Sequence, residues 1–123
     1  MTTINKPKGM LALGRLKAGA QNKTELAYEE FLKRLVQAGQ VAWFKFEGVK
    51  LRLADNTFYT PDYAVMLTNG QMEMHEVKGA RAIFQDDAKV KVKVAAEIYP
   101  FRFLVAYPPT KKNGGAWEFD SYS

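Results

Sequence analysis

Two acids and a lysine occupy unusual places in the stretch YTPDYAVMLTNGQMEMHEVKG, residues 59–79: Asp62, Glu76 and Lys78. Paired carboxylates suit hard divalent cations such as Mg²⁺, and a neighbouring lysine can stabilise developing negative charge. The surrounding residues favour two β-strands, in which alternate side chains point to the same face. Glu76 and Lys78 therefore continue a strand face that two methionines would turn towards the core.

The loop between these strands decides whether the two acids meet. A two-residue turn would place Asp62 opposite Val77. A three-residue loop with Gly70 in the left-handed conformation places Asp62 opposite Glu76, and only this register pairs methionine with methionine, so we predict it. The carboxylates would then lie within about 5 Å at Cβ, which is unfavourable unless a cation lies between them. In the alternative interpretation, the hairpin end is solvated and Lys78 merely neutralises two acids.

Composition limits the other kinds of chemistry. The 123-residue chain has no cysteine and one histidine, which excludes disulfides, thiolate metal sites and sites that need two histidines. Any metal chemistry must therefore use carboxylates, which suit Mg²⁺ or Mn²⁺. No apolar run is long enough to span a bilayer and no signal-peptide pattern opens the chain, so we expect a cytoplasmic protein without a membrane partner.

The clearest helix in the sequence is KTELAYEEFLKRLVQAG, for which we predict Thr24 as N-cap and Gly39 as C-cap. Its apolar stripe is expected to consist of Leu26, Phe31, Leu32, Leu35 and Val36. The chain length suits one domain, which we place at residues 21–123.

The remaining elements are mostly strands. We expect them at VAWFKF, VKLRLAD, TFYTPDYAVML, QMEMHEVKG and FRFLVAY, with a last edge strand at 117–119. The segment DDAKVKVKVAAEIYP is ambiguous, and we assign it to a helix with Val90, Val94 and Ile98 aligned on one side. The order of elements predicts an α/β fold with a mixed β-sheet flanked by helices.

Basic residues are concentrated at the start of the chain. Residues 1–20 carry four basic side chains and no acid, a charge of +4, whereas the whole chain has a net charge of +5. Such a basic flexible arm suggests a polyanionic partner, most often nucleic acid, although a solubilising tail has the same composition. The candidate contacts to a DNA backbone are Lys6, Lys8, Arg15, Lys17, Arg52, Arg81, Lys89, Lys91 and Lys93. Each alone is more often a solvated surface charge, and Lys91 falls within the apolar arc of its helix.

The sequence Pro61-Asp62, then thirteen residues, then Glu76-Val77-Lys78 resembles the PD-(D/E)XK signature of the restriction-endonuclease-like nucleases. The predicted order of elements around it resembles the αβββαβ core of that superfamily. NKTELAY, LRLADNTFYTPDYAVM, HEVKG and KVKVAAEIYPFRF further resemble a phage-encoded family of small nucleases related to Holliday-junction resolvases of the endonuclease-I type. The resemblance covers about residues 21–107.

This resemblance implies a Mg²⁺-dependent DNA endonuclease, in which Mn²⁺ can substitute, that hydrolyses phosphodiester bonds and acts on branched or junction DNA during recombination. Asp62 and Glu76 would ligate the ion together with the backbone carbonyl of Val77, and Lys78 would orient or help deprotonate the attacking water. A homodimer would suit the two-fold symmetry of a junction, and a phage-encoded enzyme would act in the host cytoplasm. A non-catalytic nucleic-acid-binding module on the same fold is the alternative, and a small structural or interaction protein is a third hypothesis.

The family's additional acid lies on the first helix, where Glu25 matches best and Glu29, one turn later, is the alternative. Either acid could instead serve only the electrostatics of the helix N-terminus. His75 is expected on the opposite strand face, away from the proposed site. Three aromatic side chains could stack on splayed bases, although core packing is the more usual role. They are Tyr59, Tyr63 and Phe84.

Overall fold

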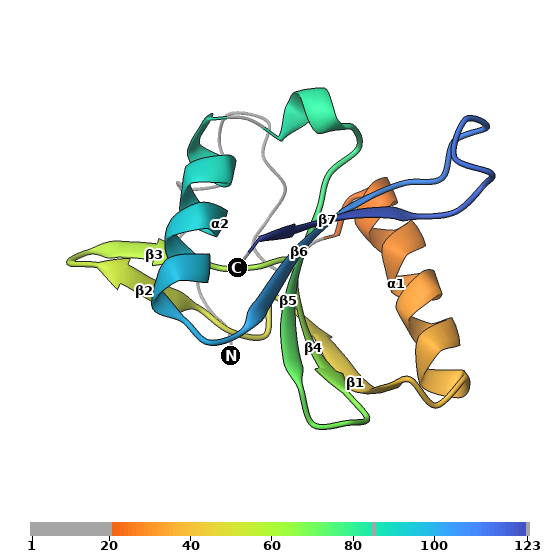
Figure 1. Cartoon of the computed structure of the whole chain (residues 1–123), viewed down its shortest axis with the longest axis horizontal. Coiled ribbons are helices and arrows are strands. Elements are labelled where there is room, and N and C mark those ends of the chain that lie inside the picture. The colour runs from red at the N-terminus through yellow and green to blue at the C-terminus, as the bar shows by residue number, and fades with distance from the viewer. Residues whose placement is uncertain (1–20, 85, 123) are drawn as a thin grey trace.

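A mixed five-stranded sheet with a helix on each face forms the centre of the protein (Figure 1). The computed structural model describes residues 21–84 and 86–122. Its elements are, in chain order, α1 (Lys23–Gln37), β1 (Val41–Phe46), β2 (Leu51–Ala54), β3 (Thr57–Tyr59), β4 (Tyr63–Leu67), β5 (Met72–Val77), the 3₁₀ turn η2 (Arg81–Ile83), α2 (Asp86–Ile98), β6 (Arg102–Tyr107) and β7 (Glu118–Tyr122). The predicted α/β class with a mixed sheet and two helices is therefore confirmed.

Strand order in the sheet is β1-β4-β5-β6-β7. Neighbouring strands run antiparallel except for β5 and β6, which are parallel and are joined by a crossover through α2. The predicted arm at residues 1–20, with its four basic side chains, lies outside the described residues. Within the described ranges, no helix is long and apolar enough to cross a membrane.

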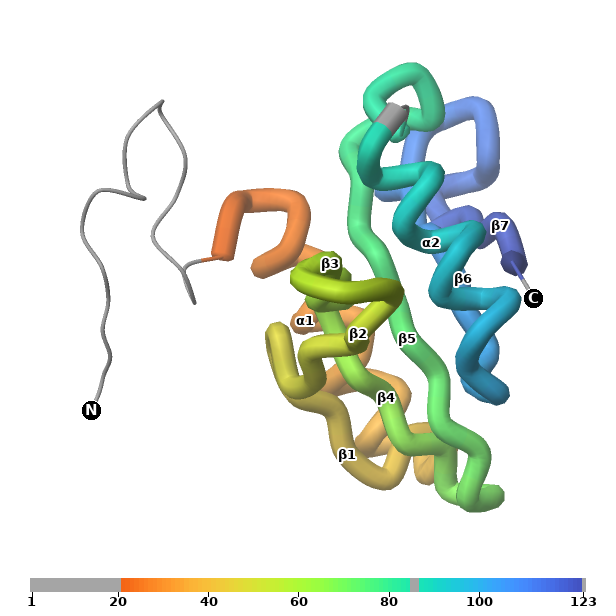
Figure 2. Tube along the Cα trace, turned by 90° about the vertical axis from the view of Figure 1, so that its left-hand side faces the viewer, coloured from red at the N-terminus to blue at the C-terminus, as the bar shows by residue number. Residues whose placement is uncertain are grey.

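Each face of the sheet has its own core. Helix α1 packs on one face around the fully buried Tyr28 and Leu32, whereas α2 and the β2–β3 hairpin cover the other face around Met74 and Val92. Figure 2 shows α2 and this hairpin on the near side of the sheet, with α1 behind it. The central strand β5 is consequently covered on both sides, so that every residue from Glu73 to Val77 is buried. Burial of both faces is typical of central strands beside a parallel crossover.

Helix α1 begins one residue after its cap, Asn22, and the prediction of Thr24 as N-cap is wrong. The Asn22 side chain accepts the backbone N–H of Glu25 at 2.8 Å, and the Glu25 carboxylate accepts the backbone N–H of Asn22 at 2.9 Å. This reciprocal capping box satisfies two helix-end donors, which Thr24 could not do without a partner at the matching position. The predicted stripe is also too wide, because Leu26 and Val36 are 50% and 38% exposed.

The predicted strand at residues 57–67 is in fact two strands in different sheets. Strand β3 pairs with β2 in a separate hairpin, whereas β4 pairs with β1 and β5. The break includes Pro61, which has no backbone N–H to donate to a sheet. The chain therefore leaves one sheet and enters the other within three residues, and Asp62 is the last residue before β4.

The predicted register of the β4–β5 hairpin is confirmed. Met66 pairs with Met72 and Ala64 pairs with Met74. The Leu67 N–H donates to the carbonyl of Gln71 at 2.9 Å, and Gly70 has a φ of +90°, as the three-residue loop requires.

Helix α2 confirms the helix assignment, but its predicted inner face is wrong. Val90, Val94 and Ile98 are 58%, 36% and 51% exposed, while Val92 and Ala95 are buried. The alternating valines place apolar side chains on both sides of the helix, so periodicity alone did not distinguish them. The side with the small Ala95 packs on the sheet and leaves a valine-rich side in solvent. The predicted edge strand is present as β7, which pairs with β6 and is longer than expected.

Candidate active site

Asp62 and Glu76 lie side by side where strands β4 and β5 reach the edge of the buried sheet. The last pair of this ladder joins Tyr63 and His75, and continuing the antiparallel register sets Asp62 against Glu76. The Asp62 carboxylate accepts the backbone N–H of Val77 at 2.7 Å. Asp62 is therefore held across the hairpin rather than turned into solvent.

Both carboxylate oxygens of Glu76 have partners. The hydroxyl of Tyr59 donates to Oε1 at 2.6 Å, and the ammonium group of Lys78 lies 3.2 Å from Oε2. Glu76 is only 7% exposed, and Tyr59 reaches it from the β2–β3 hairpin on the same face of the sheet. These two contacts fix the orientation of Glu76 and place a cation beside it.

Glu25 is the helix acid nearest to this pair. It is 8% exposed at the start of α1, and its charge acts on both Asp62 and Glu76. Glu29 is directed elsewhere, because its carboxylate contacts the Gln21 amide and accepts the Tyr63 hydroxyl at 3.3 Å. Between the two alternatives from the sequence, Glu25 is thus the one that adjoins the cluster.

The cluster contains three acids and one lysine, so its carboxyl groups repel one another. Burial, followed by the charge of Glu76, raises the pKa of Asp62 to about 9, with Glu25 adding to the shift and the Val77 N–H opposing it. Burial also raises the pKa of Glu76, although Lys78 and the Tyr59 hydroxyl oppose this effect. At neutral pH Asp62 therefore retains a proton unless a cation takes its place.

The donor set fits a hydrated divalent ion better than a closed protein cage. Within the described residues, no three or more Asp, Glu, His or Cys side chains are grouped so that they could hold a metal ion by themselves. Mg²⁺, however, commonly uses one or two carboxylates and completes its octahedron with water and substrate phosphate. The Val77 carbonyl is also available on the correct side, because the N–H and C=O of a strand residue point to the same edge. Asp62, Glu76 and Val77 could thus hold such an ion.

The basic residues predicted to contact DNA are dispersed. Arg52 lies exposed on β2, and Lys91 and Lys93 lie exposed on α2, where Lys89 is half-buried. Arg81 already has partners on β7: its guanidinium lies 2.9 Å from a Glu118 oxygen and 3.2 Å from an Asp120 oxygen, over the ring of Tyr107. The charge of Arg81 is therefore balanced locally, whereas Lys91 and Lys93 are exposed to solvent. The candidates in the arm, Lys6, Lys8, Arg15 and Lys17, lie outside the described residues.

The second face of β5 carries a separate buried polar network. His75 Nε2 lies 2.8 Å from a Glu73 oxygen, and its Nδ1 lies 2.6 Å from the Tyr28 hydroxyl. Arg102 donates to the other Glu73 oxygen at 3.2 Å. Burial acts to raise the pKa of Glu73, but His75 and Arg102 outweigh it and lower this pKa. As predicted, His75 faces away from Asp62 and Glu76. Its contacts with Glu73 and Tyr28 join α1 to the sheet.

Sequence reasoning missed the role of Tyr59. The sequence predicts a base-stacking or core role for this residue, and the structure buries it together with Tyr63 and Phe84, which excludes stacking on DNA without rearrangement. Its hydroxyl nevertheless contacts Glu76, and Gln21 and Tyr63 likewise fix Glu29. A polar aromatic residue three positions before a candidate metal-binding aspartate was the available signal.

No model of a known protein family matches the chain, and comparison with curated proteins and with solved structures finds no match.

Proposed function

We propose that the protein is a DNA endonuclease of the PD-(D/E)XK type that depends on Mg²⁺ or Mn²⁺. One observation carries the proposal: the carboxyl groups of Asp62 and Glu76 are held together at the end of a buried hairpin, with Glu25 and Lys78 beside them. Such a cluster destabilises the metal-free protein, and a structural role does not explain it, since apolar residues would pack there at lower cost.

The arrangement of elements supports the proposal. The chain passes through α1, three strands of the sheet (β1, β4 and β5), then α2 and β6, with the β2–β3 hairpin inserted after β1. This order supports the proposal of the αβββαβ core that the sequence resemblance implies. We therefore propose a restriction-endonuclease-like core with an inserted hairpin that supplies Tyr59.

The side chains would divide the work of phosphodiester hydrolysis. Asp62, Glu76 and the Val77 carbonyl would hold the divalent ion, which supplies Lewis-acid stabilisation of the charge that develops on the phosphate. Tyr59 and the Val77 N–H keep the two carboxylates in place. Lys78, 3.2 Å from Glu76, orients the attacking water and stabilises negative charge as the P–O3′ bond breaks.

The test is incubation of the pure protein with supercoiled, linear and four-way-junction DNA in Mg²⁺, Mn²⁺ or EDTA. Asp62→Ala and Lys78→Ala should abolish metal-dependent cleavage, whereas Asp55→Ala and Lys33→Ala, which replace exposed side chains away from the cluster, should not. Cleavage that survives Asp62→Ala would come from a contaminant or another site. We propose branched DNA as the substrate class on the basis of the resemblance, and faster cleavage of the junction than of linear duplex tests it.

The same experiment separates the other hypotheses. Binding of DNA without cleavage in any metal would favour a non-catalytic nucleic-acid-binding module. Neither binding nor cleavage would leave a structural or interaction protein. Sedimentation of the protein with and without junction DNA tests the proposed homodimer.

A further inference from the structure

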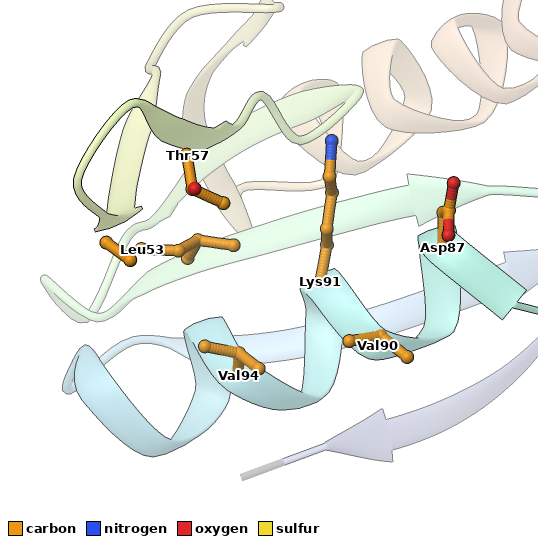
Figure 3. A pocket seen from close by; sticks show the side chains of 7 residues that line it. Leu53, Thr57, Asp87, Val90, Lys91 and Val94 are labelled. Atoms are coloured by element: carbon orange, nitrogen blue, oxygen red, sulfur yellow. The ribbon is translucent and has the colours of Figure 1, made fainter.

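A cavity of about 330 Å³ lies between the β2–β3 hairpin and α2 (Figure 3). It is lined by Leu53, Ala54, Thr57, Asp87, Val90, Lys91 and Val94. None of the clustered acids contributes to it, so the cavity is distinct from the candidate active site. Its walls are mainly apolar, and its three polar side chains are Thr57 on β3 and Asp87 and Lys91 on α2.

The lining of this cavity suits an apolar group of modest size. Val90 and Val94 are 58% and 36% exposed, and covering them would remove apolar surface from water. Leu53 and Thr57 face them from the hairpin (Figure 3). A nucleobase has two flat apolar faces and a polar edge, and enzymes that extrude a base hold it between aromatic or apolar side chains.

Lys91 adds a cation at the mouth of the cavity. Its side chain extends away from α2 past the hairpin (Figure 3), and it has no ion pair or hydrogen bond with any residue that the structure describes. Asp87 lies one turn earlier on the same helix but is not paired with it, and offers a carboxylate acceptor. A nucleotide with its base in the cavity would place its negatively charged phosphate near the positively charged Lys91.

The cavity also adjoins the candidate active site. Thr57 lines the cavity, and Tyr59, two residues further along β3, donates its hydroxyl to Glu76. Residues two apart on a strand share a face and are about 7 Å apart. A base beside Thr57 would therefore belong to a nucleotide within one or two positions of a phosphate held near Glu76.

We propose that this cavity receives one unpaired base of the DNA strand that is cut, with the adjoining phosphate bound to Lys91. The inference rests on the proposed nuclease function and specifies its substrate: DNA with an unpaired nucleotide next to the cleaved bond. A base in continuous duplex is stacked and paired, and must be extruded at a cost before it can enter. The cavity thus favours branch points, bulges and flaps over intact duplex.

The experiment measures fluorescence anisotropy with labelled duplexes that carry a one-nucleotide bulge, an abasic bulge or no bulge, in Ca²⁺ to prevent cleavage. We expect wild type to bind the base-containing bulge about tenfold more tightly than the abasic one, because only the base would cover the apolar walls of the cavity. Val94→Phe fills the cavity from an exposed position and should remove this difference. Lys91→Gln should lower the slope of log Kd against log salt by about 0.7–0.9. Ile98→Phe and Lys33→Gln are matched controls outside the cavity and should behave as wild type.

Equal affinity of wild type for the base-containing and abasic bulges would overturn the proposal, as would an unchanged preference in a folded Val94→Phe variant. The Val94→Phe variant without DNA is also examined by sedimentation. Altered self-association with no change in DNA affinity would mean that a second copy of the chain occupies the cavity, and would likewise overturn the proposal. Parallel cleavage assays in Mg²⁺ keep the two proposals apart. Cleavage without base preference would reject only the proposal that the cavity binds a base. Base-dependent binding without cleavage would support base binding in the cavity and reject the proposed nuclease activity.

Discussion

Replacement of Asp62 by asparagine is expected to stabilise the metal-free protein. Asparagine is neutral and keeps an oxygen that can accept the Val77 N–H, so the variant resembles the protonated state that Asp62 adopts among its acidic neighbours. In the folded protein the pKa of Asp62 is about 9, whereas an unfolded aspartate titrates at about 3.9. Because the folded pKa is the higher one, Asp62 imposes no penalty below pH 4, and the penalty grows as the pH rises towards 9.

This difference in pKa sets the size of the effect. At about 1.36 kcal/mol per pH unit, the penalty at pH 7 reaches at most about 4 kcal/mol. The carboxyl is half-buried, and water and movement of Lys78 reduce that limit, so we expect Asp62→Asn to gain about 1–3 kcal/mol at pH 7. At pH 5 the same reasoning gives about 1 kcal/mol or less.

Urea denaturation in EDTA at pH 5, 7 and 8.5 measures these values, with Asp55→Asn, an exposed acid in the β2–β3 turn, as the control. Mg²⁺ should raise the unfolding free energy of wild type more at pH 8.5 than at pH 5, because the ion replaces a proton, and should not do so for Asp62→Asn. An Asn variant that is less stable than wild type at pH 8.5, or that shows the same pH dependence, would refute the account of the cluster.

Three further substitutions test individual contacts. Tyr59→Phe removes the donor to the buried Glu76 and should cost about 1–3 kcal/mol in urea denaturation, with unchanged stability arguing that the contact is weak in solution. Lys78→Met should lower the rate of plasmid nicking by about 100-fold or more while the circular dichroism spectrum stays native; retained nicking would exclude Lys78 from the chemistry. Asn22→Ala should cost about 1 kcal/mol through loss of the helix cap, whereas Thr24→Ala should change thermal stability little; the opposite order would contradict the observed capping box.

Local patterns predicted the strand pair that carries the acids. Pairing methionine with methionine and placing Gly70 at a positive φ left one acceptable register, and the structure has it. The acids were recognisable for the same reason: charges on an otherwise apolar strand face conflict with the pattern around them.

Other features depended on contacts between distant segments and could not be read locally. Alternating valines offer α2 two apolar sides, and the packing of Ala95 on the sheet selects the one with Val92. The hydroxyl of Tyr59 finds Glu76 only because β3 leaves the main sheet and folds over it with β2. The sequence indicates that Pro61 interrupts the strand, but it does not indicate that the segments before and after Pro61 belong to different sheets.

The parallel pairing of β5 with β6 has a consequence for the timing of synthesis. The Lys78 N–H donates to the Ala106 carbonyl at 3.0 Å, so the end of the strand that carries Glu76 is fixed by a strand made well after it. Chains emerge from the ribosome at about 5–20 residues per second, and parallel pairs close only when the later strand is available. Before β6 has left the ribosome, β5 is an edge strand, and Glu76 and Lys78 lack the backbone hydrogen bonds that β6 provides. The proposed nuclease would stay inert on the ribosome, and cutting would begin only after β6 had joined the sheet.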